Sequence, residues 1–108
     1  MYSVSKDPQI AAIVKSVLEL IKDISPGKSV ELRVPPYGAI QCVVGSNHRR
    51  GTPPNTVEMS GQTLVRLINE PGLWSTLCES GEIRASGLLS DLSNVLAQAS
   101  VKFRDKSS

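Results

Sequence analysis

Two neighbouring arginines, Arg49 and Arg50, are the residues best suited to hold a charged ligand. They lie in the polar stretch His48-Arg49-Arg50-Gly51-Thr52-Pro53-Pro54-Asn55, where the paired prolines stiffen the backbone. A guanidinium group presents a fixed fork of donors that fits a carboxylate or a phosphate. Two interpretations stay open: a small-anion site at Arg49 and Arg50, or an ordinary exposed connection between strands.

The other reactive side chains form no recognisable catalytic or metal-binding pattern. His48 is the only histidine, which excludes a metal site with two imidazoles. Cys42 and Cys78 lie far apart in the sequence and lack the paired spacing of a zinc site. The sequence contains no phosphate-binding glycine loop and no nucleophile elbow. We therefore predict a protein that is not an enzyme, with no catalytic residues, no metal and no cofactor.

Length and composition set the class of protein. The chain has 108 residues, of which 40% are hydrophobic and 4% aromatic, and its net charge is +2. We expect one domain at residues 1–104 and a flexible tail at 105–108. So few aromatic residues and so small a basic excess argue against nucleic acid as a partner. Without a secretory leader or an apolar run of roughly 20 residues, we expect a soluble, cytoplasmic protein with free thiols.

The clearest predicted element is an amphipathic helix at residues 8–24. Asp7 can accept hydrogen bonds from the first free N–H groups, and Pro8 fits the first helical position. From Ile10 to Ile24, apolar residues recur at spacings of three and four, which is the period of one helix face. Ser25-Pro26-Gly27 then predicts the end of the helix.

Short strands and helices are predicted for the rest of the chain. Alternating apolar and polar residues predict strands at 30–34, 39–44, 55–59 and 82–86. Helical spacing predicts helices after Ser60, around Trp74, and from about Ser90-Asp91 onward. Strands segregated from helices in this way favour an α+β fold, with an antiparallel or mixed sheet and helices on one face.

Several charged or polar side chains alternate away from the predicted core. These residues are Glu31, Arg33, Gln41, Glu58 and Arg84. They could form a polar binding floor, but we favour a solvated sheet face with cross-strand pairs of roughly 0.2–1 kcal/mol each.

Two stretches carry a family resemblance. The segment Ser80–Gly87 has the order Ser-Gly-x-apolar-x-x-x-Gly and leads into a helix with Leu92 and Leu96. The segments 30–39 and 50–55 supply a strand, a Pro-Pro-Tyr-Gly-Ala turn and an Arg-Gly-Thr-Pro-Pro-Asn loop. In order and spacing, the chain resembles the short bacterial sterol-carrier-like proteins found mainly in actinobacteria, over nearly its whole length.

The resemblance implies a mixed sheet of about five strands, with an apolar cavity between the sheet and its helices. A fifth strand could lie at 97–104, where Val101 and Phe103 alternate, and it would shorten the last helix. Because such bacteria generally make no sterol, the implied ligand is an apolar small molecule or lipid. The inward positions that would line the cavity are Ile40, Val44, Val57, Leu67, Leu73, Trp74, Leu77, Ile83, Leu88, Leu92, Val95 and Leu96. For each of them, ordinary core packing is the competing interpretation.

Three functions follow from these observations. The first is a carrier of an apolar ligand, with at most transient membrane contact. A pocket of roughly 300 Å³ left empty would cost about 7 kcal/mol, so we expect it to be filled or nearly closed. The second is a protein-interaction module, which could also form a homodimer. The third is an enzyme that holds a small anion at Arg49 and Arg50, next to Glu58 or Tyr37.

Overall fold

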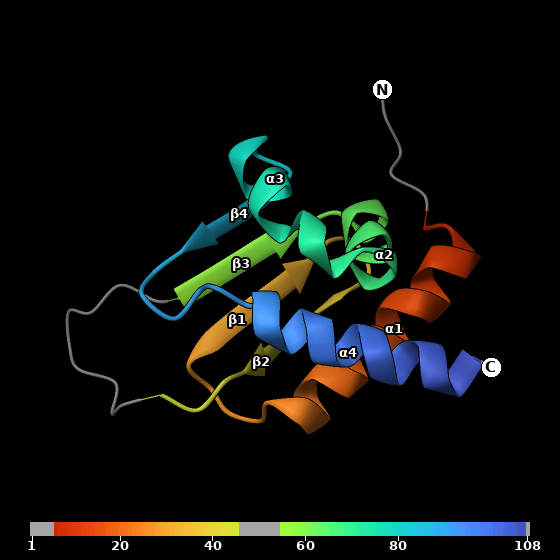
Figure 1. The fold of residues 1–108 in the computed structure, drawn as a ribbon, viewed down its shortest axis with the longest axis horizontal. Helices are drawn as coiled ribbons and strands as arrows, with labels where there is room; N and C mark the ends of the chain where they lie inside the picture. Colours follow the sequence, from red (N-terminus) through yellow and green to blue (C-terminus); the bar gives the residue numbers. More distant parts are fainter. Residues whose placement is uncertain (1–5, 46–54, 108) are drawn as a thin grey trace.

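The computed structural model describes residues 6–45 and 55–107. The loop with His48, Arg49 and Arg50 lies outside these residues, so the predicted anion site stays a prediction. The helices and strands, in chain order, are α1 (Pro8–Ile24), β1 (Val30–Val34), β2 (Gly38–Cys42), β3 (Asn55–Met59), α2 (Gly61–Asn69), the 3-10 helix η1 (Pro71–Leu73), α3 (Trp74–Glu79), β4 (Ile83–Ser86) and α4 (Ser93–Ser107). Figure 1 shows their arrangement.

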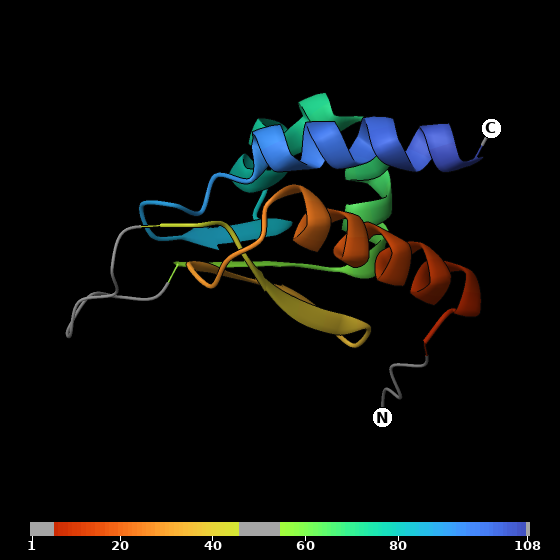
Figure 2. The same cartoon turned by 90° about the horizontal axis from the view of Figure 1, so that it is seen from below.

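The strands form one mixed sheet in the order β2-β1-β3-β4. β1 pairs with β2 as an antiparallel hairpin and with β3 in parallel, while β4 pairs antiparallel with β3. Figure 2 shows α1 and α4 on the same side of this sheet. The architecture is therefore α+β, as the sequence predicts.

Helix α1 has the bounds that its sequence predicts. A side-chain oxygen of Asp7 accepts hydrogen bonds from the backbone N–H groups of Gln9, at 2.8 Å, and Ile10, at 3.3 Å. At the other end, the N–H of Ser25 donates to the carbonyl of Ile21. The apolar face is buried along its length, with Val14, Val17, Leu18, Leu20 and Ile21 in the core. Cap and periodicity agree here, which makes the helix predictable.

Strand β2 is shorter than predicted because the chain turns at Val43. This residue has a φ of 69°, which is unusual for a β-branched side chain. Two backbone hydrogen bonds hold it there: its N–H donates to the Ser25 carbonyl, and its carbonyl accepts from the Ser29 N–H. The end of β2 is thus set by the loop that follows α1.

The expected fifth strand at 97–104 is not formed, and this prediction was wrong. The segment lies within α4, because Leu92, Leu96 and Ala99 have helical spacing and are all fully buried. The hydroxyl of the buried Ser100 also donates to the carbonyl of Ile68 on α2, which fixes this face of α4. The described part of the chain therefore contains four strands, and the expected domain boundary after residue 104 falls inside a helix.

Before α4, Asp91 stabilises the first turn. Its Oδ1 accepts a hydrogen bond from the Ser93 N–H at 2.9 Å. Hydrogen bonds from the side chain and backbone of Ser93 lower the pKa of the Asp91 carboxyl below its ordinary value. The predicted helix start near Ser90-Asp91 is thus the capping segment of α4.

Replacing Leu96 with alanine tests whether α4 seals the core. Leu96 is fully buried, so Leu96→Ala should lower the free energy of unfolding by about 2–5 kcal/mol. The matched control is Val101→Ala on the same helix, where the side chain is 56% exposed and the change should stay within about 0.5 kcal/mol. Chemical denaturation measures both. Equal losses would contradict the burial of this helix face.

Candidate functional site

The space between the sheet and the helices is filled by side chains. Leu32 and Val57 from the sheet, Leu67 on α2, Leu92 just before α4 and Leu96 on α4 are all 0% exposed. A void wide enough for one water molecule would leave accessible surface on its walls, and these side chains have none. Around these residues, the side chains leave no open cavity between the sheet and the helices. This is the nearly closed outcome that the sequence analysis expects.

Most of the predicted lining residues belong to this packed core. Val57, Leu67, Trp74, Leu77, Ile83, Leu92 and Leu96 are buried, and Ile40, Leu73 and Val95 are partly buried against them. Core packing explains each of these positions without a ligand.

Val44 and Leu88 do not point inward, and for these two residues the prediction of an inward side chain was wrong. Val44 is 77% exposed because β2 ends at Cys42 and Val43 turns the chain outward. Leu88 is fully exposed because Gly87, with a φ of 105°, ends the alternation of β4. Both side chains therefore lie on the surface, beyond the ends of their strands.

Val44, Leu88 and Leu89 form an exposed aliphatic group that we call the apolar tip. Leu89 is 39% exposed, and its Cδ1 lies so close to Gly45 that a Cβ there would come within 2.7 Å of it. Figure 1 shows the β4–α4 loop and the chain beyond β2 at the same end of the molecule. The tip thus lies where the sheet–helix interface meets solvent.

Asn55, the first residue of β3, holds the loops of the apolar tip together. Its Nδ2 donates to the Ser29 carbonyl at 2.9 Å, and its Oδ1 accepts from the Leu89 N–H at 3.0 Å. Gly87 packs directly on this amide, where a Cβ would collide with it. In the sequence, Asn55 is the end of a polar loop and the first residue of a predicted strand, and no spacing rule indicates that it links two distant loops.

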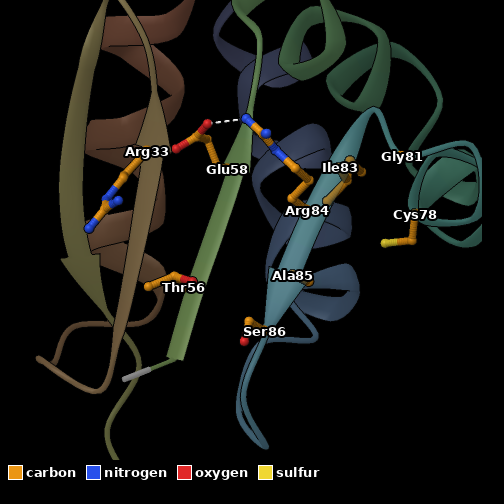
Figure 3. Close-up of a pocket in the computed structure, with 9 residues that line it drawn as sticks. All are labelled: Arg33, Thr56, Glu58, Cys78, Gly81, Ile83, Arg84, Ala85 and Ser86. Carbon is orange, nitrogen blue, oxygen red and sulfur yellow. Dashed lines mark hydrogen bonds and ion pairs between the residues drawn. The ribbon is translucent and has the colours of Figure 1, made fainter. Parts of the chain in front are cut away.

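A hollow lies over the outer face of the sheet, opposite the face that carries α1 and α4. This outer-face hollow has a volume of about 510 Å³ and is lined by Arg33, Thr56, Glu58, Arg84, Ser86 and Cys78, among others. An adjoining hollow of about 370 Å³ shares Glu58, Gly81 and Arg84 with it. Figure 3 shows Glu58 and Arg84 joined by an ion pair, and Cys78 on α3 beyond the edge of β4.

The charges of this face pair with one another along the sheet. Arg84 lies opposite Glu58 in the antiparallel register and forms an ion pair with it. Arg33 pairs with Glu31 two residues away on β1. All four side chains are at least 30% exposed, so both pairs are solvated. Of the two, Glu58–Arg84 is the cross-strand kind that the alternating sequence favours, whereas Glu31–Arg33 lies within one strand.

Cys78 is the thiol that lines the hollow, and the fold raises its pKa. Partial burial is the largest cause of the raised pKa of Cys78, and the nearby carboxylates of Asp91 and Glu79 raise this pKa further. Cys42 is buried, which raises its pKa as well. Both cysteines are free, as predicted. Among the described residues, no group of three His, Cys, Asp or Glu side chains could hold a metal ion.

Alkylation with iodoacetamide tests the state of the two thiols. Because the thiolate is the reacting species, Cys78 should react more slowly at neutral pH than in the unfolded chain. Its pH profile should be displaced upward, since its pKa is raised in the fold. Cys42, which is 0% exposed, should react more slowly still. Peptide mapping by mass spectrometry separates the two sites, and a Cys78 that reacts faster when folded would contradict this assignment.

Asn55→Ala tests the link between the loops. Loss of two hydrogen bonds should lower the free energy of unfolding by about 1–3 kcal/mol and speed hydrogen exchange at the Leu89 amide. The control is Asn69→Ala, because the Asn69 amide donates only within its own helix, to the Val65 carbonyl. Unchanged exchange at Leu89 in Asn55→Ala would show that the loop is held by other contacts.

Comparison with known proteins places the chain in a family. A family model described as "Bacterial SCP ortholog" matches residues 6–97, which include the four described strands and the start of α4. The search of curated proteins gave no match. Within the described residues, no helix has both the length and the apolar character needed to cross a membrane. The match covers most of the described fold, and the chain belongs to the bacterial orthologues of sterol carrier protein.

Proposed function

We propose that this protein carries a small apolar molecule, such as a lipid chain, which binds at the apolar tip. Membership in a sterol-carrier-like family supports a carrier role. The observation that carries the proposal is the exposure of Val44, Leu88 and Leu89, whose segments lie at the same end of the molecule. Exposed aliphatic side chains that gather at one place mark a binding surface more often than scattered ones do.

The closed core is compatible with this role. An empty ligand pocket of roughly 300 Å³ would cost about 7 kcal/mol, against a total stability of about 5–15 kcal/mol for a domain of this size. A carrier this small is more stable when its core closes in the absence of ligand. The ligand's own apolar surface then offsets the cost of opening.

Uptake would begin at the loop that joins β4 to α4. This loop is held by the Asn55–Leu89 hydrogen bond and by the Ser90 hydroxyl, which donates to the Gly87 carbonyl at 2.7 Å. Displacing only residues 87–89 of this loop leaves the fully buried Leu92, just before α4, and Leu96 on α4 in place. A ligand chain can therefore insert at the tip while the rest of the core stays packed.

Leu88→Gln tests the tip as the binding surface. Leu88 is fully exposed, so this change should alter the free energy of unfolding by no more than about 0.5 kcal/mol. Covering a leucine side chain contributes about 1.5–3 kcal/mol, so binding of a fluorescent fatty acid should weaken at least about tenfold. The titration is followed by fluorescence, and organic extracts of both proteins are compared by mass spectrometry.

The matched control is Val101→Gln, another exposed aliphatic position, which lies on α4 outside the tip. Its affinity for the fatty acid should equal that of the unaltered protein. If neither the probe nor any extracted apolar molecule binds, or if both variants lose affinity equally, the tip is not the ligand site.

A further inference from the structure

The turn at Val43 goes against the preference of the local sequence. The sequence pattern predicts a strand that continues through Val44, whereas β2 ends at Cys42. Val43 has a φ of 69°, a backbone region that disfavours β-branched side chains. Such a residue keeps this conformation only where its surroundings hold it, and backbone outliers of this kind gather at sites that bind or move. We therefore asked which contacts hold the turn.

Half of the next pair of the β1–β2 ladder is already formed at this turn. The register that pairs Val30 with Cys42 continues to Ser29 and Val43. The Ser29 N–H donates to the Val43 carbonyl at 3.0 Å, as it does in a hydrogen-bonded antiparallel pair. The second bond of such a pair would run from the Val43 N–H to the Ser29 carbonyl. That N–H donates to the Ser25 carbonyl instead, at 2.8 Å, so β2 stops one hydrogen bond short of a longer strand.

Asn55 occupies the carbonyl that the missing bond would use. Its Nδ2 donates to the Ser29 carbonyl at 2.9 Å, and its Oδ1 accepts from the Leu89 N–H at 3.0 Å. Displacing residues 87–89, the step with which uptake begins, breaks the bond to Leu89 and leaves the Asn55 amide held at one end only. The Ser29 carbonyl can then exchange this amide for the Val43 N–H, which completes the ladder pair.

Leu89 also holds the chain that follows the turn. A Cβ on Gly45 would come within 2.7 Å of the Leu89 Cδ1 and within 2.5 Å of the Ser29 Oγ, so both side chains close on this glycine. When Leu89 moves away, Gly45 loses one of these two contacts. In a longer β2, Val44 lies on the same side of the sheet as Cys42, which is fully buried. The Val44 side chain, 77% exposed in the turned form, would then face inward, toward the entering ligand.

We propose that Val43 is a switch that links ligand uptake at the apolar tip to the length of β2. With residues 87–89 in place, Val43 keeps its left-handed turn and Val44 points to solvent. When a ligand displaces these residues, Val43 becomes extended, β2 reaches Val44, and the Val44 side chain packs on the ligand. The positive φ disfavours the turned form and the contacts of residues 87–89 favour it, so removing those contacts shifts the balance. The inference rests on the proposed function, because that ligand moves the loop.

The test is an NMR titration of the full-length, ¹³C,¹⁵N-labelled protein with the fatty acid. On binding, the Cα and Cβ chemical shifts of Val43 should move to the values of an extended strand. A nuclear Overhauser effect should also appear between the Hα atoms of Lys28 and Val44. These two residues form the next non-hydrogen-bonded pair of the register, in which the strands approach most closely.

Val43→Gly and Val43→Ala are the matched variants. Both remove the branched side chain, but glycine adopts a positive φ without the penalty that alanine retains. Val43→Gly should therefore favour the turned form, and it should unfold at a higher denaturant concentration than Val43→Ala. Because the turned form is then harder to leave, Val43→Gly should bind the fatty acid about fivefold more weakly than Val43→Ala. Fluorescence titration measures both affinities.

Failure of the switch and failure of the proposed function give different results. If the fatty acid binds while the Val43 shifts keep their ligand-free values, the switch is wrong and the proposed function stands. If no fatty acid binds, both are wrong. Equal affinities of Val43→Gly and Val43→Ala, or a greater stability of Val43→Ala, would overturn the switch as well. If either variant does not fold, the Val43 shifts and the Lys28–Val44 contact in the unaltered protein still decide the outcome.

Discussion

The packed interface between the sheet and its helices is the contact on which every other feature of this protein depends. Leu32 and Val57 face each other across the parallel β1–β3 pair and are fully buried. Leu67 on α2 and Leu96 on α4 close over the same layer. Because a chain of this size has little stability to lose, a permanent cavity in this layer would remove much of it. A ligand bound as proposed would therefore meet the margin of the layer, where the chain leaves aliphatic side chains uncovered.

Local signals in the sequence predict most of the elements. Helix α1 was predictable because the Asp7 cap, Pro8 and the apolar spacing all indicate one structure. The structure of residues 97–104 was not predictable in this way. Val101 and Phe103 have the two-residue spacing of a strand, while Ala99 and Phe103 have the four-residue spacing of a helix. The contact that decides between them is the Ser100 hydroxyl on the Ile68 carbonyl, which joins residues distant in the chain. The early end of β2 likewise depends on Ser25 and Ser29.

The candidate site was less predictable than the fold. Apolar residues selected for a cavity lining are the same residues that a solid core requires, so the sequence alone cannot separate the two. Val44 and Leu88 leave the core because the turns at Val43 and Gly87 change the direction of the chain, and those turns depend on positive φ angles. The role of Asn55 depends on two loops that meet only in the folded molecule.

The contacts that each route breaks determine where such a protein opens for a ligand. Separating the sheet from its helices along their whole length would expose side chains such as Leu67 and Leu96, at about 1.5–3 kcal/mol each. Lifting only residues 87–89 of the β4–α4 loop breaks the Asn55–Leu89 hydrogen bond and the bond from the Ser90 hydroxyl to the Gly87 carbonyl, which contribute about 1 kcal/mol each, and leaves the buried Leu92 in place. Leu88 is already exposed and loses nothing in that motion. The route at the tip therefore has the smaller cost, and it leads directly to the apolar surface that a guest would cover.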